Sequence, residues 1–582
     1  MKSEMKEKKL MPYLLRYWKS AIVSPIFMLG EVLVDLLQPT LMSKIVDQGV
    51  MGQDMAVIVQ TGLLMLGLVV IGGVMGVAAA GFASTAAQNF GNDLRCDTFD
   101  RVMHLSLQQT DGFTTGSLVT RLTNDITAVQ DLSSMALRMF VRSPISFVGG
   151  IIMAVRLNVN FGIVLLCALP LELIFIFLIL RKASPLFTIV QKKLDKVNAV
   201  VQENVTGARM VKAYVNEEYE EERFKTANND LMNTSYRVQK LMAAATPVLT
   251  LFMNAVVVLI ILIGGWQVEA AEMEVGSIMA GVTYTTQILM SIMMVSMMFQ
   301  TISRSRASAA RIREVLNTRP CIEDGGAKEG TDPGAVCFRN VSFRYPSSTG
   351  APVLKSIDLE IRKGENIAIL GVTGAGKTSL VSLIPRFYDV TGGSVCVDGR
   401  DVREYDLDAL RSRIGFVLQK SELFSGSIAD NIRWGNETAG DEEVRQAARI
   451  AQADEFIQGF KSGYDTIIGE KGSSLSGGQK QRISIARAIL KQPEILIFDD
   501  STSALDLGTE ARLQAALREN LHGVTVITIA QRVASVKNAD RIVVLEDGAV
   551  AACGSHSELL QTSGIYRDIY NSQAGEGEKI HG

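Results

Sequence analysis

The stretch "IAILGVTGAGKTSLVSLI" holds the residues with the clearest chemical purpose in this chain of 582 residues. An apolar segment leads through a glycine loop into a helical pattern, and Gly371, Gly376, Lys377 and Thr378 fit the spacing G-x-x-x-x-G-K-[ST]. Glycines let backbone N–H groups close around phosphate oxygens, and the following helix adds its positive N-terminal dipole. Lys377 can reach the outer phosphates of a nucleotide, and Thr378 offers a hydroxyl to magnesium. The stretch predicts a phosphate-binding strand, loop and helix.

Two further segments carry candidate chemistry. "ILIFDDSTSALD", residues 495–506, ends an apolar strand with Asp499 and Asp500. In a nucleotide site the first acid would hold magnesium and the second would act on water. "LSGGQKQRISIARAI", residues 475–489, opens a helix with Ser476, Gly477 and Gly478, which predicts a second anion-binding helix N-terminus.

Together with the glycine loop, this last segment resembles the signature of ABC-type ATPases, and the other motifs of that family follow in order over about residues 335–565. Tyr345 in "VSFRYP" resembles the aromatic residue that stacks on adenine. Gln419 resembles the glutamine that touches magnesium and senses the membrane domain. Asp499 matches the magnesium-side aspartate, and Asp506 in "SALD" matches the loop that communicates across the dimer.

The resemblance implies ATP and Mg²⁺ as cofactors. The magnesium contacts that it implies are Thr378, Gln419 and Asp499. The ATP contacts that it implies are Tyr345, Gly371, Thr373, Gly374, Ala375, Gly376, Lys377, Thr378, Ser379, Gln419, Leu475, Ser476, Gly477, Gly478, Gln479 and Asp506. In this family each site takes the phosphate loop and the acids from one chain and LSGGQ from another.

The chain departs from the family pattern at two catalytic positions. The family places glutamate after the magnesium aspartate and histidine at the switch, whereas this chain has Asp500 and Gln531. A missing methylene withdraws the carboxylate by about 1.5 Å, and a misplacement of about 1 Å can slow a reaction by about a hundredfold. A neutral amide does not reproduce the geometry or titration of imidazole. We therefore expect a site that binds ATP and hydrolyses it poorly.

The elements that must position these motifs fall into two halves of different composition. The N-terminal half contains six apolar stretches of the length that a spanning helix needs, about 20 residues. They are residues 21–46, 55–92, 133–155, 157–180, 241–268 and 275–303. The third is the least apolar, because Arg138 and Arg142 lie in its first half. Residues 93–132 and 181–240 have amphipathic helical patterns, which predicts that the membrane helices continue into the cytoplasm.

Lys and Arg residues predict the orientation of these spans. The N-terminal segment and residues 181–240 are basic, whereas the opposite connections, residues 47–54, 156–160 and 269–274, are short and nearly free of bases. We therefore expect a multi-pass protein of the cytoplasmic (inner) membrane with its N-terminus and ATPase domain in the cytoplasm. The lipid bilayer is an implied partner. The net charge of −3 indicates no nucleic-acid partner.

The predicted fold is multidomain: an all-α six-helix transmembrane domain with long cytoplasmic helical extensions, followed by an α/β phosphate-loop ABC nucleotide-binding domain. The expected boundaries are an N-terminal elbow at 1–20, the transmembrane domain at 21–318, a linker at 319–334, the ATPase domain at 335–570 and a disordered tail at 571–582. The six cysteines are scattered, with no paired spacing, which argues against a disulfide framework or a zinc site.

The first half also resembles the type I ABC exporter. "DGFTTGSLVTRLTNDI" (111–126) and "ENVTGARMVKAYVNEEYEEERF" (203–224) resemble its two intracellular coupling segments. This implies a half-transporter that needs a second half. The two catalytic departures favour a heterodimer of the bacterial multidrug type, in which the partner keeps Glu and His and this chain lends it LSGGQ. The expected substrate is a small amphipathic compound, a drug or a lipid.

The sequence also fits two other functions, and it excludes or disfavours two more. A slow homodimeric exporter of lipid or peptide, or a largely regulatory ATP-binding subunit, would also fit the motifs. A soluble ABC ATPase acting on nucleic acid is excluded by the six apolar spans. An importer is disfavoured, because importers usually keep membrane and ATPase parts on separate chains.

Acidic residues inside the predicted spans are candidate substrate contacts. Glu31 and Asp35 lie four residues apart on one face of the first span, and Glu172 lies in the fourth. Intramembrane acids are costly to expose to lipid, so each suggests a function, such as attracting cationic substrates. The alternative is a structural role in which neighbouring helices satisfy them.

Overall fold

A computed structural model of the chain describes residues 9–332, 334–346 and 348–573, so residues 1–8 of the predicted elbow and 574–582 of the predicted tail lie outside the described part. The chain divides into two compact units. The first comprises residues up to Met103 and Thr115–Thr318, and the second comprises His104–Thr114 and the chain from Arg319 onward. Each unit is described by itself.

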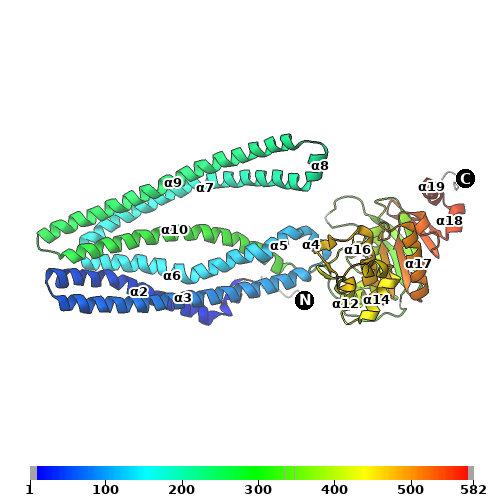
Figure 1. Ribbon diagram of the computed structural model, residues 1–582, viewed down its shortest axis with the longest axis horizontal. Helices are drawn as coiled ribbons and strands as arrows, with labels where there is room; N and C mark the ends of the chain where they lie inside the picture. Colours follow the sequence, from blue (N-terminus) through cyan, green and yellow to red (C-terminus); the bar gives the residue numbers. More distant parts are fainter. Residues whose placement is uncertain (1–8, 333, 347, 574–582) are drawn as a thin grey trace. The chain divides into compact units, whose positions relative to one another are not determined.

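The first unit is built from helices (Figure 1). Six helical segments of the described chain are long and apolar enough to cross a membrane, as the sequence predicted. The helices of this unit are α1 (Met11–Leu15), α2 (Trp18–Lys44), α3 (Met55–Met103), α5 (Thr115–Thr120), α6 (Ile126–Leu157), α7 (Val159–Thr206), α8 (Ala208–Ala213), α9 (Glu217–Glu269) and α10 (Val275–Asn317), with π-helical turns at Ile45–Met51 and Arg121–Asp125.

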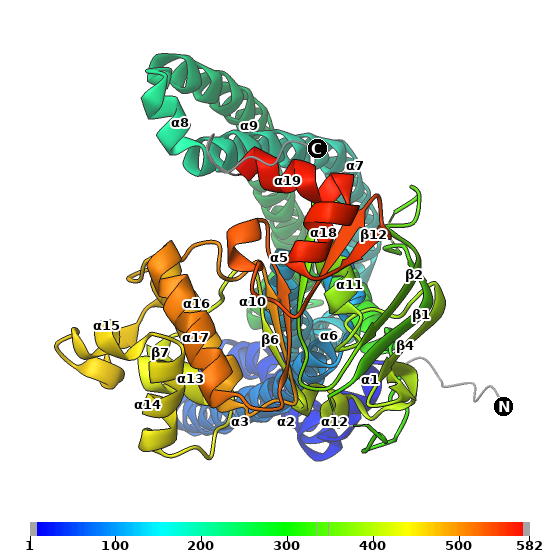
Figure 2. The same ribbon diagram turned by 90° about the vertical axis from the view of Figure 1, so that its right-hand side faces the viewer.

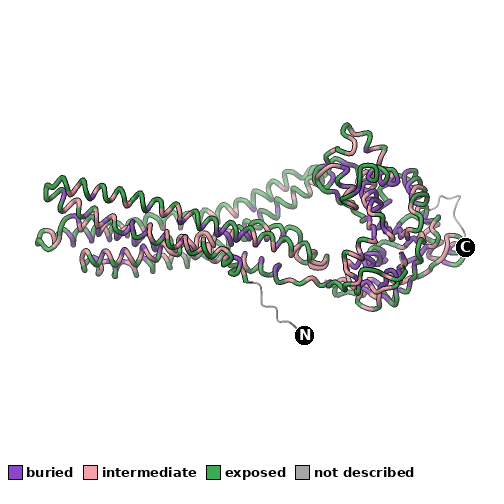
Figure 3. Tube along the Cα trace, turned by 90° about the horizontal axis from the view of Figure 1, so that it is seen from below, coloured by how far each residue is buried: buried purple, intermediate pink, exposed green. Residues whose placement is uncertain are grey.

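Several of these helices run past the length of a bilayer. The helix α3 has 49 residues, α7 has 48 and α9 has 53, whereas a span needs about 20. The stretches that the sequence assigned to cytoplasmic extensions are therefore helical. Figure 3 shows that these long helices carry mostly exposed and intermediate positions, since an apolar helix that faces lipid or another subunit need not be buried within its own chain.

The second unit is an α/β domain with two main sheets (Figure 2). A four-stranded sheet has the order β2-β1-β4-β5, formed by Leu354–Ile361, Val336–Phe343, Gly392–Val397 and Arg400–Asp401. A six-stranded sheet has the order β12-β11-β3-β10-β9-β6, formed by Ala549–Gly554, Arg541–Glu546, Asn366–Gly371, Thr525–Ile529, Ile495–Asp499 and Ile414–Val417. In the second sheet every neighbouring pair is parallel except β11 with β12.

The helices of the second unit surround these sheets. They are α4 (Leu107–Phe113), α11 (Lys377–Ser382), α12 (Leu407–Ser412), α13 (Ile428–Arg433), α14 (Asp441–Ile450), α15 (Asp454–Gln458), α16 (Gly477–Leu490), α17 (Leu507–Asn520), α18 (His556–Thr562) and α19 (Gly564–Gln573), with a short ribbon of β7 (Gly426–Ser427) and β8 (Ile467–Ile468). Because α19 extends to Gln573, the first three residues of the predicted disordered tail are helical.

The central strand β9 shows how the sequence builds this core. Its five residues are all buried, and successive side chains point to opposite faces. Ile495 and Ile497 join a cluster with Leu380 of α11. Leu496 and Phe498 join a second cluster that includes residues of α16 and α17. An unbroken apolar run is what a parallel strand covered on both faces requires.

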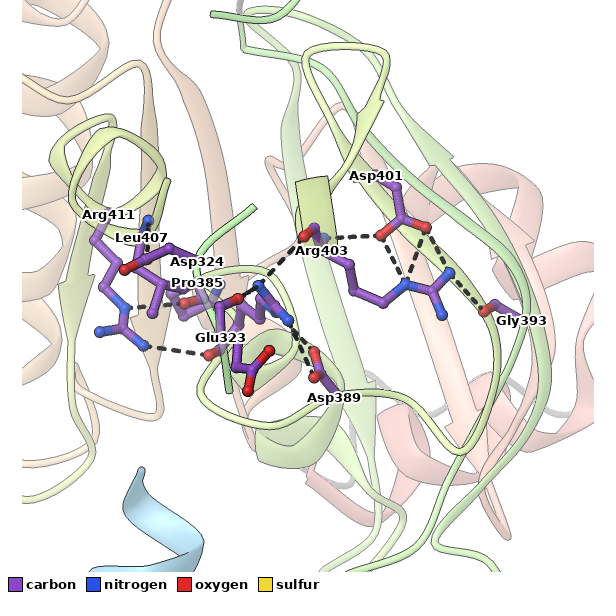
Figure 4. Close-up of polar contacts among 10 residues, drawn as sticks. Glu323, Asp324, Pro385, Asp389, Gly393, Asp401, Arg403, Leu407 and Arg411 are labelled. Carbon is purple, nitrogen blue, oxygen red and sulfur yellow. Dashed lines mark hydrogen bonds and ion pairs between the residues drawn. The ribbon is translucent and has the colours of Figure 1, made fainter. Parts of the chain in front are cut away.

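The predicted linker is held against the second unit (Figure 4). The Gly325 N–H donates to the carbonyl of Tyr405 at 2.9 Å, and the Arg386 guanidinium donates to the carbonyl of Glu323 at 2.8 Å. Asp324 caps α12 by accepting from the Leu407 N–H at 3.0 Å. In this Gly- and charge-rich segment, residues 323–325 are therefore fixed by hydrogen bonds to the rest of the unit.

Candidate nucleotide site

The candidate site lies where four neighbouring parallel strands end. The carboxyl end of β3 leads into the glycine loop, β9 ends at Asp499, and β6 and β10 lead within two residues to Gln419 and Gln531. The pairing register aligns the ends of β3, β9 and β10, because Ile529 of β10 pairs with both Asp499 of β9 and Ile369 of β3. Parallel sheets bind ligands at this edge because all their strand ends meet there.

The glycine loop has the conformation that a phosphate cradle requires. Gly374 and Gly376 have φ angles of +89° and +94°, in the left-handed region that favours glycine. A β-carbon at Gly376 would lie 2.8 Å from a side-chain carbon of Leu354, so a larger residue has no room. Gly376 directly precedes α11, and its neighbours therefore present backbone N–H groups at a helix N-terminus.

Lys377 is buried at the start of α11. Its ammonium donates to the carbonyls of Gly371 at 2.7 Å and Val372 at 3.0 Å. Burial lowers the pKa of Lys377, and the nearby carboxylates of Asp500 and Asp499 oppose that shift. A desolvated cation held by carbonyl dipoles beside a glycine loop is suited to bind an incoming phosphate.

Asp499 and Thr378 form the pair that fits magnesium. The Thr378 hydroxyl donates to Oδ1 of Asp499 at 2.8 Å, so two hard oxygen ligands already lie together. Burial raises the pKa of the Asp499 carboxyl, and the hydrogen bond from Thr378 opposes this. A bound cation would compensate the buried charge of Asp499, so these residues fit the ion that the family implies.

Asp500 lies between two amides. Its Oδ2 accepts from Nε2 of Gln531 at 2.8 Å and from Nε2 of Gln419 at 3.1 Å. The backbone of Asp500 has a φ of +47°, a conformation that aspartate tolerates, and it turns the chain sharply after β9. Both hydrogen bonds go to Oδ2, so the two amides fix the orientation of this short carboxylate.

A cavity of about 310 Å³ joins these groups. Its lining contains Thr373, Gly374, Gly376, Lys377, Thr378, Ser379, Gln419, Asp500 and Gln531, with Val353 and Ile529. Val353 and Ile529 could not be predicted from the sequence, because the apolar wall of a cavity has no motif of its own. Gly371 and Ala375 support the loop from outside the lining: the Gly371 carbonyl accepts from Lys377, and Ala375 is buried.

Tyr345 lies beside the loop but outside this lining. Its hydroxyl lies 2.9 Å from the Ser379 hydroxyl, and its ring packs edge-on against Phe343 and Tyr388 at centroid distances of 4.8 and 5.3 Å. The Tyr388 hydroxyl donates to Asp111 of α4 at 3.4 Å. Burial and the nearby Asp111 raise the pKa of Tyr388 to about 12. This aromatic cluster therefore links the region beside the glycine loop to the short helix α4.

The signature residues are also absent from the cavity lining. Ser476 caps α16, accepting from the Gln479 N–H while Gln479 accepts from the Ser476 N–H. Leu475 is buried, whereas Ser476 and Gly477 are exposed and Gly478 is half-buried. Asp506 is exposed and caps α17 by accepting from the Thr509 N–H at 2.9 Å. These helix starts present N–H groups outward, with their geometry already set.

The acids within the first unit differ in their partners. Arg142 of α6 pairs with Glu31, and its other nitrogen lies 2.9 Å from Asp35. Glu172 of α7 is 3% exposed, and its Oε2 has no hydrogen-bond partner among the described residues. In the sequence Arg142 only makes its span less apolar, and its pairing with the two acids of α2 has no signal there.

Comparisons with known proteins agree with this description. The model of the ABC transporter transmembrane region matches residues 21–292, and the ABC transporter model matches residues 354–503. The chain is 39% identical to the ABC transporter ATP-binding protein YfiB of Bacillus subtilis, covering 97% of this chain and 98% of that protein. It is 32% identical to an ATP-dependent lipid A-core flippase of Chromobacterium violaceum, covering 98% and 97% of the two chains.

A solved bacterial Atm1-family ABC exporter with ATP bound has a similar structure, with a TM-score of 0.79 and 26% identity over 97% of this chain and 99% of that chain. The chain therefore belongs to the ABC transporter family. It is a type I exporter half-transporter, a multi-pass membrane domain fused to an ATPase domain, and its ATPase domain implies ATP binding.

Replacing Lys377 by Ala should weaken ATP binding to this chain by about ten- to a hundredfold, because a hydrogen bond to a charged group contributes about 1.5–3 kcal/mol. Photolabelling of the full-length chain with azido-ATP over a concentration series measures the half-saturation. Lys363→Ala, at an exposed lysine of the same unit, is the control. An unchanged half-saturation in Lys377→Ala would contradict the assignment of the phosphate loop.

Proposed function

We propose that this chain is one subunit of an asymmetric heterodimeric exporter, and that its own site binds ATP with Mg²⁺ but hydrolyses it slowly. The partner is a second half-transporter that keeps a catalytic glutamate and a switch histidine. The complex moves amphipathic drugs or lipids out across the cytoplasmic membrane by alternating access, with the N-terminus and ATPase domain in the cytoplasm.

The observation that carries this proposal is the arrangement of Asp500 between Gln419 and Gln531. The carboxylate is on a short side chain at the end of β9, and both neighbouring amides donate to the same oxygen. A base that accepts a proton from water needs a free lone pair aimed at that water. Here the two amides fix the orientation of a carboxylate whose side chain is one methylene shorter than glutamate, and the switch position offers an amide that does not titrate.

The binding half of the site is retained. The glycine loop, Lys377 and the Thr378–Asp499 pair have the residue types and contacts that hold a triphosphate and its metal. Magnesium would neutralise phosphate charge at Thr378 and Asp499, with Gln419 beside them. A site that binds ATP but does not activate water keeps its ATP intact. The bound ATP would then stabilise the closed dimer for longer than one turnover of the partner's site.

The exposed signature supports a role at a second site. Ser476 and Gly477 lie outside this chain's own cavity lining, at the N-terminus of a 14-residue helix. Their N–H groups and the helix dipole can complete the phosphate site of a partner that supplies its own glycine loop. This chain would therefore contribute to catalysis through α16 rather than through Asp500.

Two alternatives use the same residues differently. A slow homodimer that exports lipid or peptide would hydrolyse ATP at two equivalent sites with Asp500 as the base. A largely regulatory subunit would bind ATP and leave transport to its partner. The relative named as a lipid A-core flippase favours a lipid-like substrate, which is a member of the amphipathic class proposed here.

Among the intramembrane acids, we propose Glu172 as the substrate contact. Arg142 forms an ion pair with both Glu31 and Asp35, which favours a structural role for those two, whereas no ion pair of the described residues includes Glu172. Glu172 lies one turn from Ala168 on the same face of α7, and Ala168 packs with Val256 of α9 and Leu289 of α10. A buried carboxylate with an open oxygen would favour amphiphiles that carry a positive charge.

Gly477→Asp should abolish most ATPase activity of the assembled complex, although Asp500 is untouched. The new carboxylate would repel the phosphate at the partner's competent site, and loss of such a stabilising contact costs on the order of a hundredfold. Ser462→Asp adds the same charge at an exposed position of the same unit and should leave turnover unchanged. Wild-type steady-state turnover in Gly477→Asp would exclude the proposed role of the signature.

Asp500→Asn should reduce turnover of the assembled pair far less than neutralising the partner's glutamate, because Asp500 is not the base for the competent site. Loss of a working base costs about 10²–10⁴ in rate. Steady-state ATPase of the reconstituted pair compares the two variants. Equal loss of turnover in both variants would favour the slow homodimer.

The double substitution Asp500→Glu with Gln531→His should raise hydrolysis at this site if the partner's signature supports it.

Glu172→Gln should weaken stimulation of the ATPase by a cationic amphiphile on the order of tenfold in half-maximal concentration, because an interaction with a charged group is lost. A neutral congener of the same size should be unaffected, and Glu172→Asp, which keeps the charge, should lie closer to the wild type. Equal changes for the cationic and neutral compounds would indicate that Glu172 serves packing alone.

A further inference from the structure

The four-stranded sheet places two cysteines opposite each other, although their sequence spacing gives no sign of it. Cys337 of β1 pairs with Cys396 of β4 in the antiparallel register. Side chains that face each other across an antiparallel pair project from the same face of the sheet. The other cysteines, Cys96, Cys167, Cys321 and Cys553, are exposed and have no cysteine opposite them in the described strands.

The separation suits a cross-strand bond. The Asp398 N–H donates to the Ala335 carbonyl at 2.9 Å, and alternation along the ladder then makes Cys337 and Cys396 a hydrogen-bonded pair. Such pairs have α-carbons about 5.5 Å apart, within the range of about 4.4–6.8 Å that a disulfide spans. The ladder is irregular between Arg339 and Ser342, which gives β1 freedom to adjust.

The two thiols differ in access and surroundings. Cys337 is half-buried, whereas Cys396 is 5% exposed. Arg339 lies two residues along β1 on the same face, and the Cys337 sulfur is the main cause of the raised pKa of Arg339. Burial raises the pKa of the Cys396 thiol. Cys337 is the more accessible of the two thiols, so it is suited to react first.

Carboxylates flank the pair along the same row. In the register Glu360 of β2 lies opposite Cys337, and Asp401 of β5 lies opposite Cys396. Asp401 is engaged by Arg403 at 2.6 Å. The described residues contain no group of three or more His, Cys, Asp and Glu side chains placed to hold a metal ion. Cys337 and Cys396 are therefore placed for thiol exchange rather than for metal binding.

We propose that Cys337 and Cys396 form a reversible disulfide by exchange with a small disulfide such as oxidised glutathione. The Cys337 thiolate attacks one sulfur of that disulfide, forming a mixed disulfide and releasing one glutathione thiolate. Cys396 then loses its proton and attacks the Cys337 sulfur, releasing the second glutathione. Two protein thiols are oxidised, one small disulfide is reduced to two thiols, and the two protons pass to them.

The bond would join two strands with separate roles in the domain. The strand β1 leads to Tyr345 beside the glycine loop. The strand β4 leads to Asp398, which is fully buried and accepts from the Gly334 N–H at the end of the linker. Oxidation would therefore link β1, which leads to Tyr345, covalently to β4, which leads to Asp398.

The test uses the purified full-length chain, exposed to excess oxidised glutathione, alkylated and digested without reduction for mass spectrometry. We expect one linked pair of peptides containing Cys337 and Cys396, whatever glutathione adducts form on the exposed cysteines, and we expect both thiols of the pair to return after dithiothreitol. Cys553→Ser, at an exposed cysteine of the same unit, should not change this product.

The single variants test the order of events. Cys396→Ser should stop the reaction at a glutathione adduct on Cys337, and Cys337→Ser should leave Cys396 unmodified over the same time. A glutathione adduct that persists on Cys337 in the wild-type chain would overturn the proposal, as would two free thiols after oxidation. The wild-type measurement decides the question even if a variant fails to fold.

Discussion

The parallel pairing of β6, β9, β10 and β3 is the constraint on which the nucleotide site depends. Each strand contributes its carboxyl end to one edge, so residues more than a hundred positions apart in sequence become neighbours. The apolar run of β9, covered on both faces, leaves no freedom to shift this edge. The position of Asp500 is therefore set by the core, and the length of its side chain decides how far the carboxylate reaches.

That constraint explains how a site can lose one function and keep another. Binding relies on the backbone of the glycine loop, a buried ammonium and the Thr378–Asp499 pair, all of which are in place. Hydrolysis relies on a side chain that projects from the same edge toward water. A shorter acid with amides around it would leave the fold and the glycine loop unaltered. The asymmetry that we propose between two subunits would then need few substitutions.

The sequence predicted the features that are local. The glycine loop, the six apolar spans and the helix start at Ser476 depend on neighbours within a few residues, and the structure has a helix or loop of the expected kind at each. Pairing between distant segments could not be predicted in the same way. The contact of Arg142 with Glu31 depends on how α2 and α6 pack, and that of Cys337 with Cys396 depends on strand register. Composition predicted a linker at 319–334, but it did not predict the hydrogen bonds of Gly325 with Tyr405 and of Glu323 with Arg386.

The most direct test of slow hydrolysis at this site is the chemical state of the nucleotide that it holds during turnover. The assembled transporter would be photolabelled during steady-state hydrolysis with azido-ATP carrying its radiolabel either on the α- or on the γ-phosphate. The account predicts equal labelling of this chain by both forms, since its ATP remains intact, and labelling of the partner chiefly by the α-form. Loss of the γ-label from this chain at the rate seen in the partner would contradict it.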